Sequence, residues 1–89
     1  MIERTITVTN PKGVHARPAA LIAKTAMHYE SSILLKKDDV VANARQIIEI
    51  LMLCAPCGSH IVVEIDGADE EQALQSLEEV FQTHFGEED

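Results

Sequence analysis

Hydrophobic and polar residues alternate with a period of two in the first and last of four short segments that are expected to be strands. In the first segment, Ile6 and Val8 fall on one side of an extended backbone and threonines fall on the other. In the last, Ile61, Val63 and Ile65 share one side. Such alternation is typical of a strand with one buried face. The pattern therefore predicts four strands, over residues 2–9, 32–37, 40–42 and 60–66, with a hairpin turn at residues 37–39.

A helical period replaces the alternation in three other segments. The first helix is expected to run from Ala16 to about His28, with Pro18 in its first turn, where a missing N–H has no helical partner to lose. The second and third are expected over residues 46–53 and about 70–83. Each should bury one aliphatic stripe. The expected core positions are Ala19, Ile22, Ala23, Ala26 and Met27, then Ile50 and Leu53, then Ala73, Leu74, Leu77, Val80 and Phe81.

The order of these elements indicates an α+β fold. Asp69 is expected at the N-cap of the third helix, with Gln72 completing a capping box. Short alternating strands are typical of an antiparallel sheet with one covered face, so the helices should pack together on one side of it. The chain is therefore expected to form a single domain, residues 1–89, in the order βαββαβα.

The charge of the chain excludes several classes of partner. Fifteen acidic and seven basic residues give a net charge of −8. Nucleic acid and anionic membranes both select a basic surface, so we expect neither as a partner. Lys12, Arg17 and Lys24 nevertheless fall together in the first third of the chain, where they could form a locally basic surface. The acidic residues 87–89 are expected to form a solvated tail.

The segment from Asn10 to Ala19 carries the candidate chemistry. His15 is expected at or just before the start of the first helix, and a neutral imidazole nitrogen is available as a nucleophile near neutral pH. The free N–H groups of the helix terminus, at Ala16 and Arg17, suit a phosphoryl group arriving there. Arg17 can also offer a planar fork of donors to phosphate oxygens. The alternative is that His15 is a capping residue beside a surface arginine.

No segment of the sequence supplies a phosphoryl donor. The chain lacks a Gly-x-x-x-x-Gly-Lys-Ser/Thr loop and a kinase signature. A phosphorylated histidine in such a chain needs a donor and an acceptor from outside. The sequence therefore predicts a relay protein rather than an enzyme, with no cofactor.

The run Gly-Val-His-Ala-Arg-Pro-Ala, residues 13–19, resembles the active-site signature of the HPr family, the phosphocarriers of the phosphoenolpyruvate-dependent phosphotransferase system. The length and the order of elements match as well. The resemblance implies that His15 accepts phosphate on Nδ1 from enzyme I and passes it to an enzyme IIA domain, with Arg17 stabilising the phosphorylated form. It also implies an open-faced β-sandwich, with three helices covering a four-stranded antiparallel sheet.

The second predicted helix is apolar on nearly every side, and in a small domain some of this surface must be exposed. Ile47, Ile48 and Leu51 are the candidates for outward contact, and Leu21 and Lys24 from the first helix could complete a docking surface. In the resembled family this helix lies beside the histidine and contacts both partners. The alternatives are a helix buried more deeply, or one covered by dimerisation.

One position departs from the resembled family. Many HPr proteins carry a regulatory serine at the start of the second helix, where this chain has Gln46, so that mode of regulation is not expected. The Leu-Met-Leu run and the Phe81-x-x-x-Phe85 ending resemble the nitrogen-related branch, NPr, more than the sugar-system HPr proteins. An alternative function of the regulatory class is a paralogue that binds regulatory proteins and uses phosphorylation as a signal.

Cys54 and Cys57 form a C-x-x-C motif, a spacing that also occurs at redox and zinc sites. The pair follows the C-terminal end of a predicted helix, where the dipole disfavours a thiolate. With His60 the cysteines supply only three zinc ligands. Because the sequence has no signal peptide and no apolar run of about 18 residues, we expect a cytoplasmic protein with ordinary reduced thiols and no metal. A small thiol redox protein is the second alternative function.

Overall fold

The computed structural model describes residues 1–86, and its elements follow the order βαββαβα. The expected order is therefore confirmed. The strands are β1 (Ile2–Thr7), β2 (Ser32–Lys37), β3 (Val40–Asn43) and β4 (His60–Asp66). The helices are α1 (Ala16–Ala26), α2 (Ile47–Leu51) and α3 (Glu70–Gln82), and a 3-10 turn, η1 (His84–Gly86), follows α3. The expected acidic tail, residues 87–89, lies outside the described residues.

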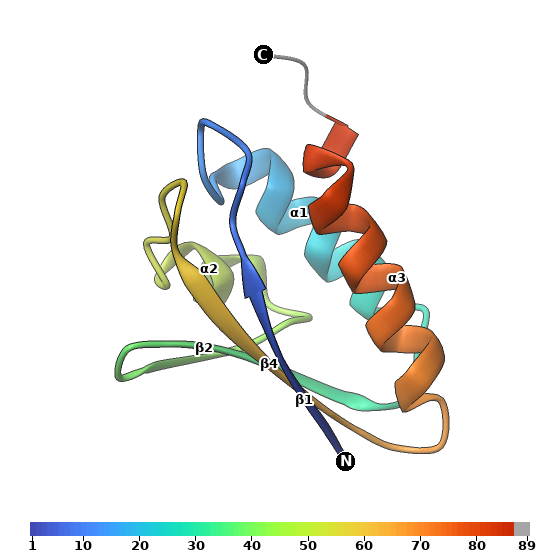
Figure 1. The fold of residues 1–89 in the computed structure, drawn as a ribbon. Coiled ribbons are helices and arrows are strands. Elements are labelled where there is room, and N and C mark those ends of the chain that lie inside the picture. The colour runs from blue at the N-terminus through green and yellow to red at the C-terminus, as the bar shows by residue number, and fades with distance from the viewer. Residues whose placement is uncertain (87–89) are drawn as a thin grey trace.

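The four strands form one antiparallel sheet in the order β1-β4-β2-β3. In its register Ile6 lies opposite Ile61 and Leu35 lies opposite Val63. The helices cover one face of the sheet, and α1 packs against both α2 and α3 (Figure 1). The open-faced sandwich expected from the sequence is therefore confirmed.

The core between the sheet and the helices is almost entirely aliphatic. Ile50 and Leu53 are buried as expected, and alternate residues of β4 point into the same core. The final aromatic residue belongs to this core too, because Phe85 is buried and its ring meets that of Phe81 edge-on, with the centroids 4.9 Å apart. Phe85 is not among the core positions that the sequence predicts. The turn η1 folds it back under α3.

Two expected core residues are not buried. Met27 is 70% exposed, because α1 ends at Ala26 and leaves Met27 at its C-cap. At about 100° per residue, Met27 would also fall at the edge of the stripe centred near Ala19 and Ala26. Val80 is half-buried, packed against the rim of the core.

The capping box predicted for α3 is wrong. Asp69 occupies the N-cap, but its side chain does not cap the helix. Its carboxylate instead accepts hydrogen bonds from the backbone N–H groups of Glu30 and Ser31 and from the Ser31 hydroxyl. These bonds join the turn before β2 to the turn before α3, and they hold the pKa of Asp69 below its usual value, the Ser31 hydroxyl being the largest cause.

The loop before α1 is attached to the loop after α2. The Val14 N–H donates to the Ala55 carbonyl oxygen at 2.8 Å. Gly13 has a φ of +69°, and a Cβ built there would lie 2.5 Å from the Ala55 oxygen and 2.8 Å from the Pro56 Cα. The buried Asn10 side chain closes the turn by donating from Nδ2 to the Gly13 carbonyl oxygen at 2.6 Å. Glycine is therefore required at position 13 by both conformation and space.

Replacing Gly13 with alanine should destabilise the domain strongly. The left-handed conformation costs about 1–2 kcal/mol for an L-residue, and displacing backbone atoms adds about 1–3 kcal/mol. Gly58→Ala is the matched control, because Gly58 also has a positive φ of +95° but its Cβ would meet nothing within 4 Å. Urea unfolding should therefore show a clearly larger loss of stability for Gly13→Ala. Equal losses of stability in the two variants would contradict the close approach of Gly13 to Ala55 and Pro56.

Asp69→Asn should change the pH dependence of stability. A carboxyl group whose folded pKa is depressed stabilises the fold fully above its unfolded value, near 4, and this contribution disappears as the pH falls through the folded pKa. The gap in unfolding free energy between wild type and variant should be full at pH 7 and should close below about pH 4. Asp39→Asn, which removes the same charge from an exposed turn, is the control, with little effect expected at pH 7. A gap for Asp69→Asn that stays constant down to pH 2 would rule out the linkage.

Candidate functional site

His15 occupies the N-cap of α1. Its backbone is extended, with φ −102° and ψ −164°, and its carbonyl oxygen accepts the first helical bond from the Ala19 N–H at 2.9 Å. Its side chain makes no capping hydrogen bond and is half-buried. The imidazole therefore does not cap the helix.

The first turn of α1 presents an environment suited to an anion. Helix geometry leaves the N–H groups of Ala16 and Arg17 without intrahelical acceptors, while Pro18 has no N–H to satisfy. Both Ala16 and Arg17 are exposed, and the first turn holds no acidic residue. Two backbone donors and the positive end of an 11-residue helix thus lie beside His15.

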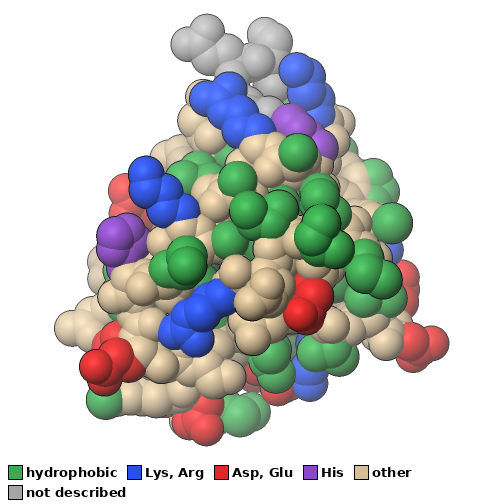
Figure 2. Space-filling model, turned by 180° about the vertical axis from the view of Figure 1, so that it is seen from behind, with side chains coloured by type: hydrophobic (Ala, Val, Ile, Leu, Met, Phe, Trp, Pro, Cys, Tyr) green, Lys and Arg blue, Asp and Glu red, His purple; other side chains and the backbone are tan. Residues whose placement is uncertain are grey.

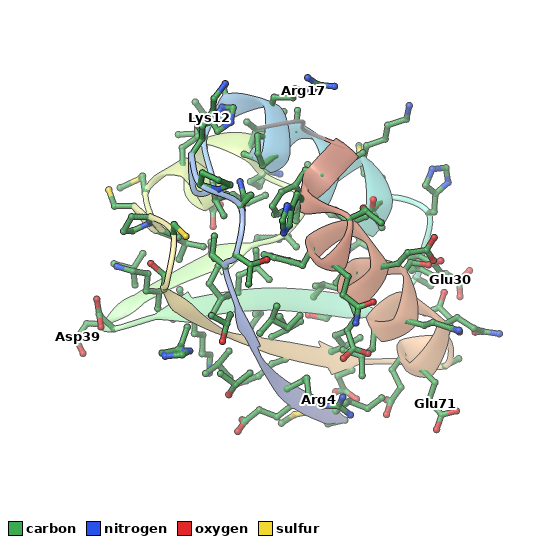
Figure 3. The ribbon with its side chains drawn as sticks, turned by 45° about the horizontal axis from the view of Figure 1, so that its top comes forward. Arg4, Lys12, Arg17, Glu30, Asp39 and Glu71 are labelled. Atoms are coloured by element: carbon green, nitrogen blue, oxygen red, sulfur yellow. The ribbon has the colours of Figure 1, made fainter. Side chains whose placement is uncertain are left out.

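Basic side chains gather at this end of the molecule. Lys12, in the loop before α1, and Arg17 extend from the same end in Figure 3, whereas Glu30, Asp39 and Glu71 lie elsewhere on the surface. The Arg17 side chain points outward rather than being packed into the fold. The locally basic surface expected from the sequence therefore exists at this end, within a chain whose net charge is −8.

Exposed apolar side chains are concentrated on α2. Ile48 is 71% exposed, and Ile47 and Met52 are exposed as well. The sequence analysis had not singled out Met52, although the apolar run predicted some such surface. Figure 2 shows hydrophobic side chains gathered on the rear face, near a histidine and basic side chains. The alternative of a deeply buried α2 is therefore wrong, because only Ile50 of this helix is buried.

The remaining candidates for docking differ in their exposure. Leu21 and Leu51 are half-buried and pack against the core, so each offers only part of its surface. Lys24 is exposed in the last turn of α1, and α1 packs directly against α2. Gln46 is the exposed N-cap of α2 and makes no side-chain capping bond. We call Ile47, Ile48, Met52 and the exposed parts of Leu21 and Leu51 the apolar patch.

Two residues that position the site were not found from the sequence. Asn10 fitted only the pattern of a turn, yet its side chain is buried and bonds to Gly13. Ala55 gave no signal at all, because it acts through its backbone oxygen on Val14. Through this bond the loop that follows α2 fixes the residue before His15. The structure thus links the loop before His15 to the loop after α2.

The cysteines do not form a metal site with His60. Both are exposed free thiols, and the His60 Nδ1 lies 3.0 Å from the Thr7 hydroxyl, with which it shares a hydrogen bond. Within residues 1–86, no three His, Cys, Asp or Glu side chains are grouped to hold a metal ion. In the same part of the chain, no helix is both long and apolar enough to span a membrane.

Known proteins resemble this chain over nearly its whole length. A family model described as the PTS HPr component phosphorylation site matches residues 2–83. Phosphocarrier protein HPr of Treponema pallidum is 42% identical over 88 residues, which cover 99% of this chain and all of that protein. Phosphocarrier protein NPr of Klebsiella oxytoca is 33% identical, with 97% of each chain covered.

The fold is also close to a solved one. The crystal structure of HPr from Thermoanaerobacter tengcongensis superimposes with a TM-score of 0.93 at 40% identity, with 99% of each chain covered. The matched span, residues 2–83, includes the four strands, the three helices and the segment around His15. The chain therefore belongs to the HPr family of phosphotransferase-system phosphocarriers, which carry phosphate and are not catalytic enzymes.

Proposed function

We propose that His15 is the residue that carries the phosphate, taking it from phospho-enzyme I and giving it to an enzyme IIA domain. The observation that carries this proposal is the position of His15, at the N-cap of α1 with a side chain that does not cap the helix. A phosphoryl group on Nδ1 would lie beside the donors at Ala16 and Arg17. The half-buried position of His15, beside exposed residues of the first helical turn, supports access for a donor and an acceptor in turn.

Each transfer exchanges one bond to phosphorus for another. The lone pair of the neutral His15 nitrogen attacks the phosphorus of the donor, whose own bond to the phosphoryl group breaks. The Arg17 guanidinium and the two backbone N–H groups balance the charge on the phosphoryl oxygens as it moves. The acceptor then repeats the step in the opposite direction, with His15 as the leaving group. The protein needs no nucleotide and no metal of its own for this chemistry.

The apolar patch is the proposed contact for both partners. Exposed aliphatic surface beside a reactive group is typical of a docking site, because its burial favours association without binding either partner permanently. The basic side chains of Lys12 and Arg17 lie at the same end as the site, with Lys24 further along α1, and would favour partners with an acidic rim. One surface would therefore serve donor and acceptor, which means that the two partners bind one after the other.

We place this relay in the cytoplasm, because that compartment keeps free thiols such as those of Cys54 and Cys57 reduced. The relative named HPr is more similar to the chain than the relative named NPr, at 42% against 33% identity. This ordering favours the sugar branch over the nitrogen branch suggested by the C-terminal sequence. Regulation through a serine at the start of α2 is excluded at Gln46 itself, which has no hydroxyl.

Incubation with phosphoenolpyruvate and enzyme I should place one acid-labile phosphate on each chain, and His15→Ala should carry none. The loss follows because no other nucleophile lies at the helix start. Phosphate incorporation and intact mass measure the result, and Asp39→Asn, at the far hairpin, serves as the control that labels normally. A stoichiometric phosphate on His15→Ala would refute the assignment of the carrier residue.

Ile48→Glu should slow transfer both from the donor and to the acceptor by about tenfold or more, because truncating or charging a central apolar contact costs at least about 1–2 kcal/mol of association free energy. Met27→Glu is the matched control, since Met27 is 70% exposed and Ile48 is 71% exposed, but Met27 lies at the opposite end of α1 from His15. Phosphoryl-transfer assays quenched at fixed times should show a lower transfer rate for Ile48→Glu than for Met27→Glu. Circular dichroism should show that both variants are folded. Equal transfer rates for the two would remove α2 from the docking surface.

A further inference from the structure

The C-x-x-C motif lies in the loop that holds the site in place. Cys54 follows α2 with a positive φ of +51°, and Cys57 begins the turn that leads into β4. Both thiols are exposed. The two residues enclosed between them, Ala55 and Pro56, are the ones that touch Gly13 and Val14.

This loop is tied to the first part of the chain on both sides. The Ala55 carbonyl oxygen accepts from the Val14 N–H at 2.8 Å, directly before His15. On the other side, the Gly58 N–H donates to the Val8 carbonyl oxygen at 2.7 Å, and the Cys57 Sγ lies 3.7 Å from the Thr9 carbonyl oxygen. Residues 54–58 therefore support the whole segment from Val8 to His15. A change of shape in the loop would be passed on to the histidine.

We propose that Cys54 and Cys57 form a thiol–disulfide exchange site whose oxidation loosens the segment carrying His15. The placement of the motif after a helix argues against a thioredoxin-type catalyst, as the sequence indicated. It does not argue against a site that is oxidised by others, for which exposure of both thiols and closeness in sequence are what matter. The functional consequence rests on the proposed role of His15.

The exchange requires a low-molecular-weight disulfide such as oxidised glutathione. One cysteine thiolate attacks a sulfur of that disulfide, its S–S bond breaks, and a mixed disulfide forms as the first glutathione leaves as a thiol. The second cysteine then attacks the protein sulfur and releases the second glutathione. The two protein thiols lose two electrons and two protons in all, and the oxidised glutathione gains both.

Closing this bridge conflicts with the present shape of the loop. A disulfide needs the two Cα atoms within about 4.4–6.8 Å, so residues 54–57 would have to form a tight turn. In the structure the turn is placed later, closed by the Ser59 N–H donating to the Pro56 carbonyl oxygen at 3.1 Å, while the Ala55 carbonyl points to Val14. Oxidation would therefore turn the Ala55–Pro56 peptide and weaken the bond to Val14.

The test equilibrates the full chain with mixtures of reduced and oxidised glutathione. Intact mass should show the loss of two hydrogens, amide hydrogen exchange of Val14 should become faster in the bridged form, and phosphorylation by enzyme I should slow by about ten- to a hundredfold, as expected for a reactive group displaced by about an ångström. Dithiothreitol should reverse all three changes. The double variant Cys54→Ser, Cys57→Ser is the matched control and should respond to none of the mixtures.

The outcomes separate this inference from the proposed function. A chain that never loses two hydrogens, even in fully oxidised glutathione, would overturn the exchange site. A bridged chain in which Val14 exchanges, or phosphate is transferred, at the rate of the reduced chain would overturn the link to His15. If the reduced chain takes no phosphate at all, the proposed function fails instead, and the exchange site is then decided by the mass and the Val14 amide alone.

Discussion

The hydrogen bond between the Val14 N–H and the Ala55 carbonyl oxygen is the contact on which the site depends. It joins a loop that precedes one helix to a loop that follows another, over 41 positions of sequence. Gly13 permits it by leaving no side chain between the two backbones. As a result, the loop before α1 is fixed to the loop after α2, and His15 follows a supported turn.

The proposed relay requires one surface of a small fold to serve two partners in turn. The chemistry requires little beyond backbone donors, a histidine and a nearby guanidinium, all of which come from the first turn of a single helix. The proposed docking surface comes mainly from aliphatic side chains of α2. Because the reactive group and the docking surface come from different helices, either can change in sequence without rebuilding the other.

The sequence allowed most of the architecture to be predicted, while the roles of His15 and Arg17 stay predictions. Alternation and helical periodicity report which side of an element faces the core, and they placed Ile50 and Leu53 correctly. These patterns gave wrong predictions for residues whose burial or hydrogen bonding depends on where a helix ends or on residues distant in the sequence. Met27 is exposed because α1 ends before it, and Phe85 is buried because η1 turns the chain back. Asp69 met the local pattern of a cap, but hydrogen bonds from Glu30 and Ser31, which are 39 and 38 positions away, hold its carboxylate.

The position of β4 in the sheet affects how the protein folds during its synthesis. This strand is the last of the four in the chain, yet it is the one that pairs with both β1 and β2. During synthesis β1 must therefore remain unpaired until more than fifty further residues have been made. Non-local pairing of this kind slows folding, because the entropy of closing a long loop is lost before the contacts form. A nascent chain that already contains His15 still lacks the complete sheet on which the helices pack. The site around His15 therefore forms in a single late folding event rather than gradually.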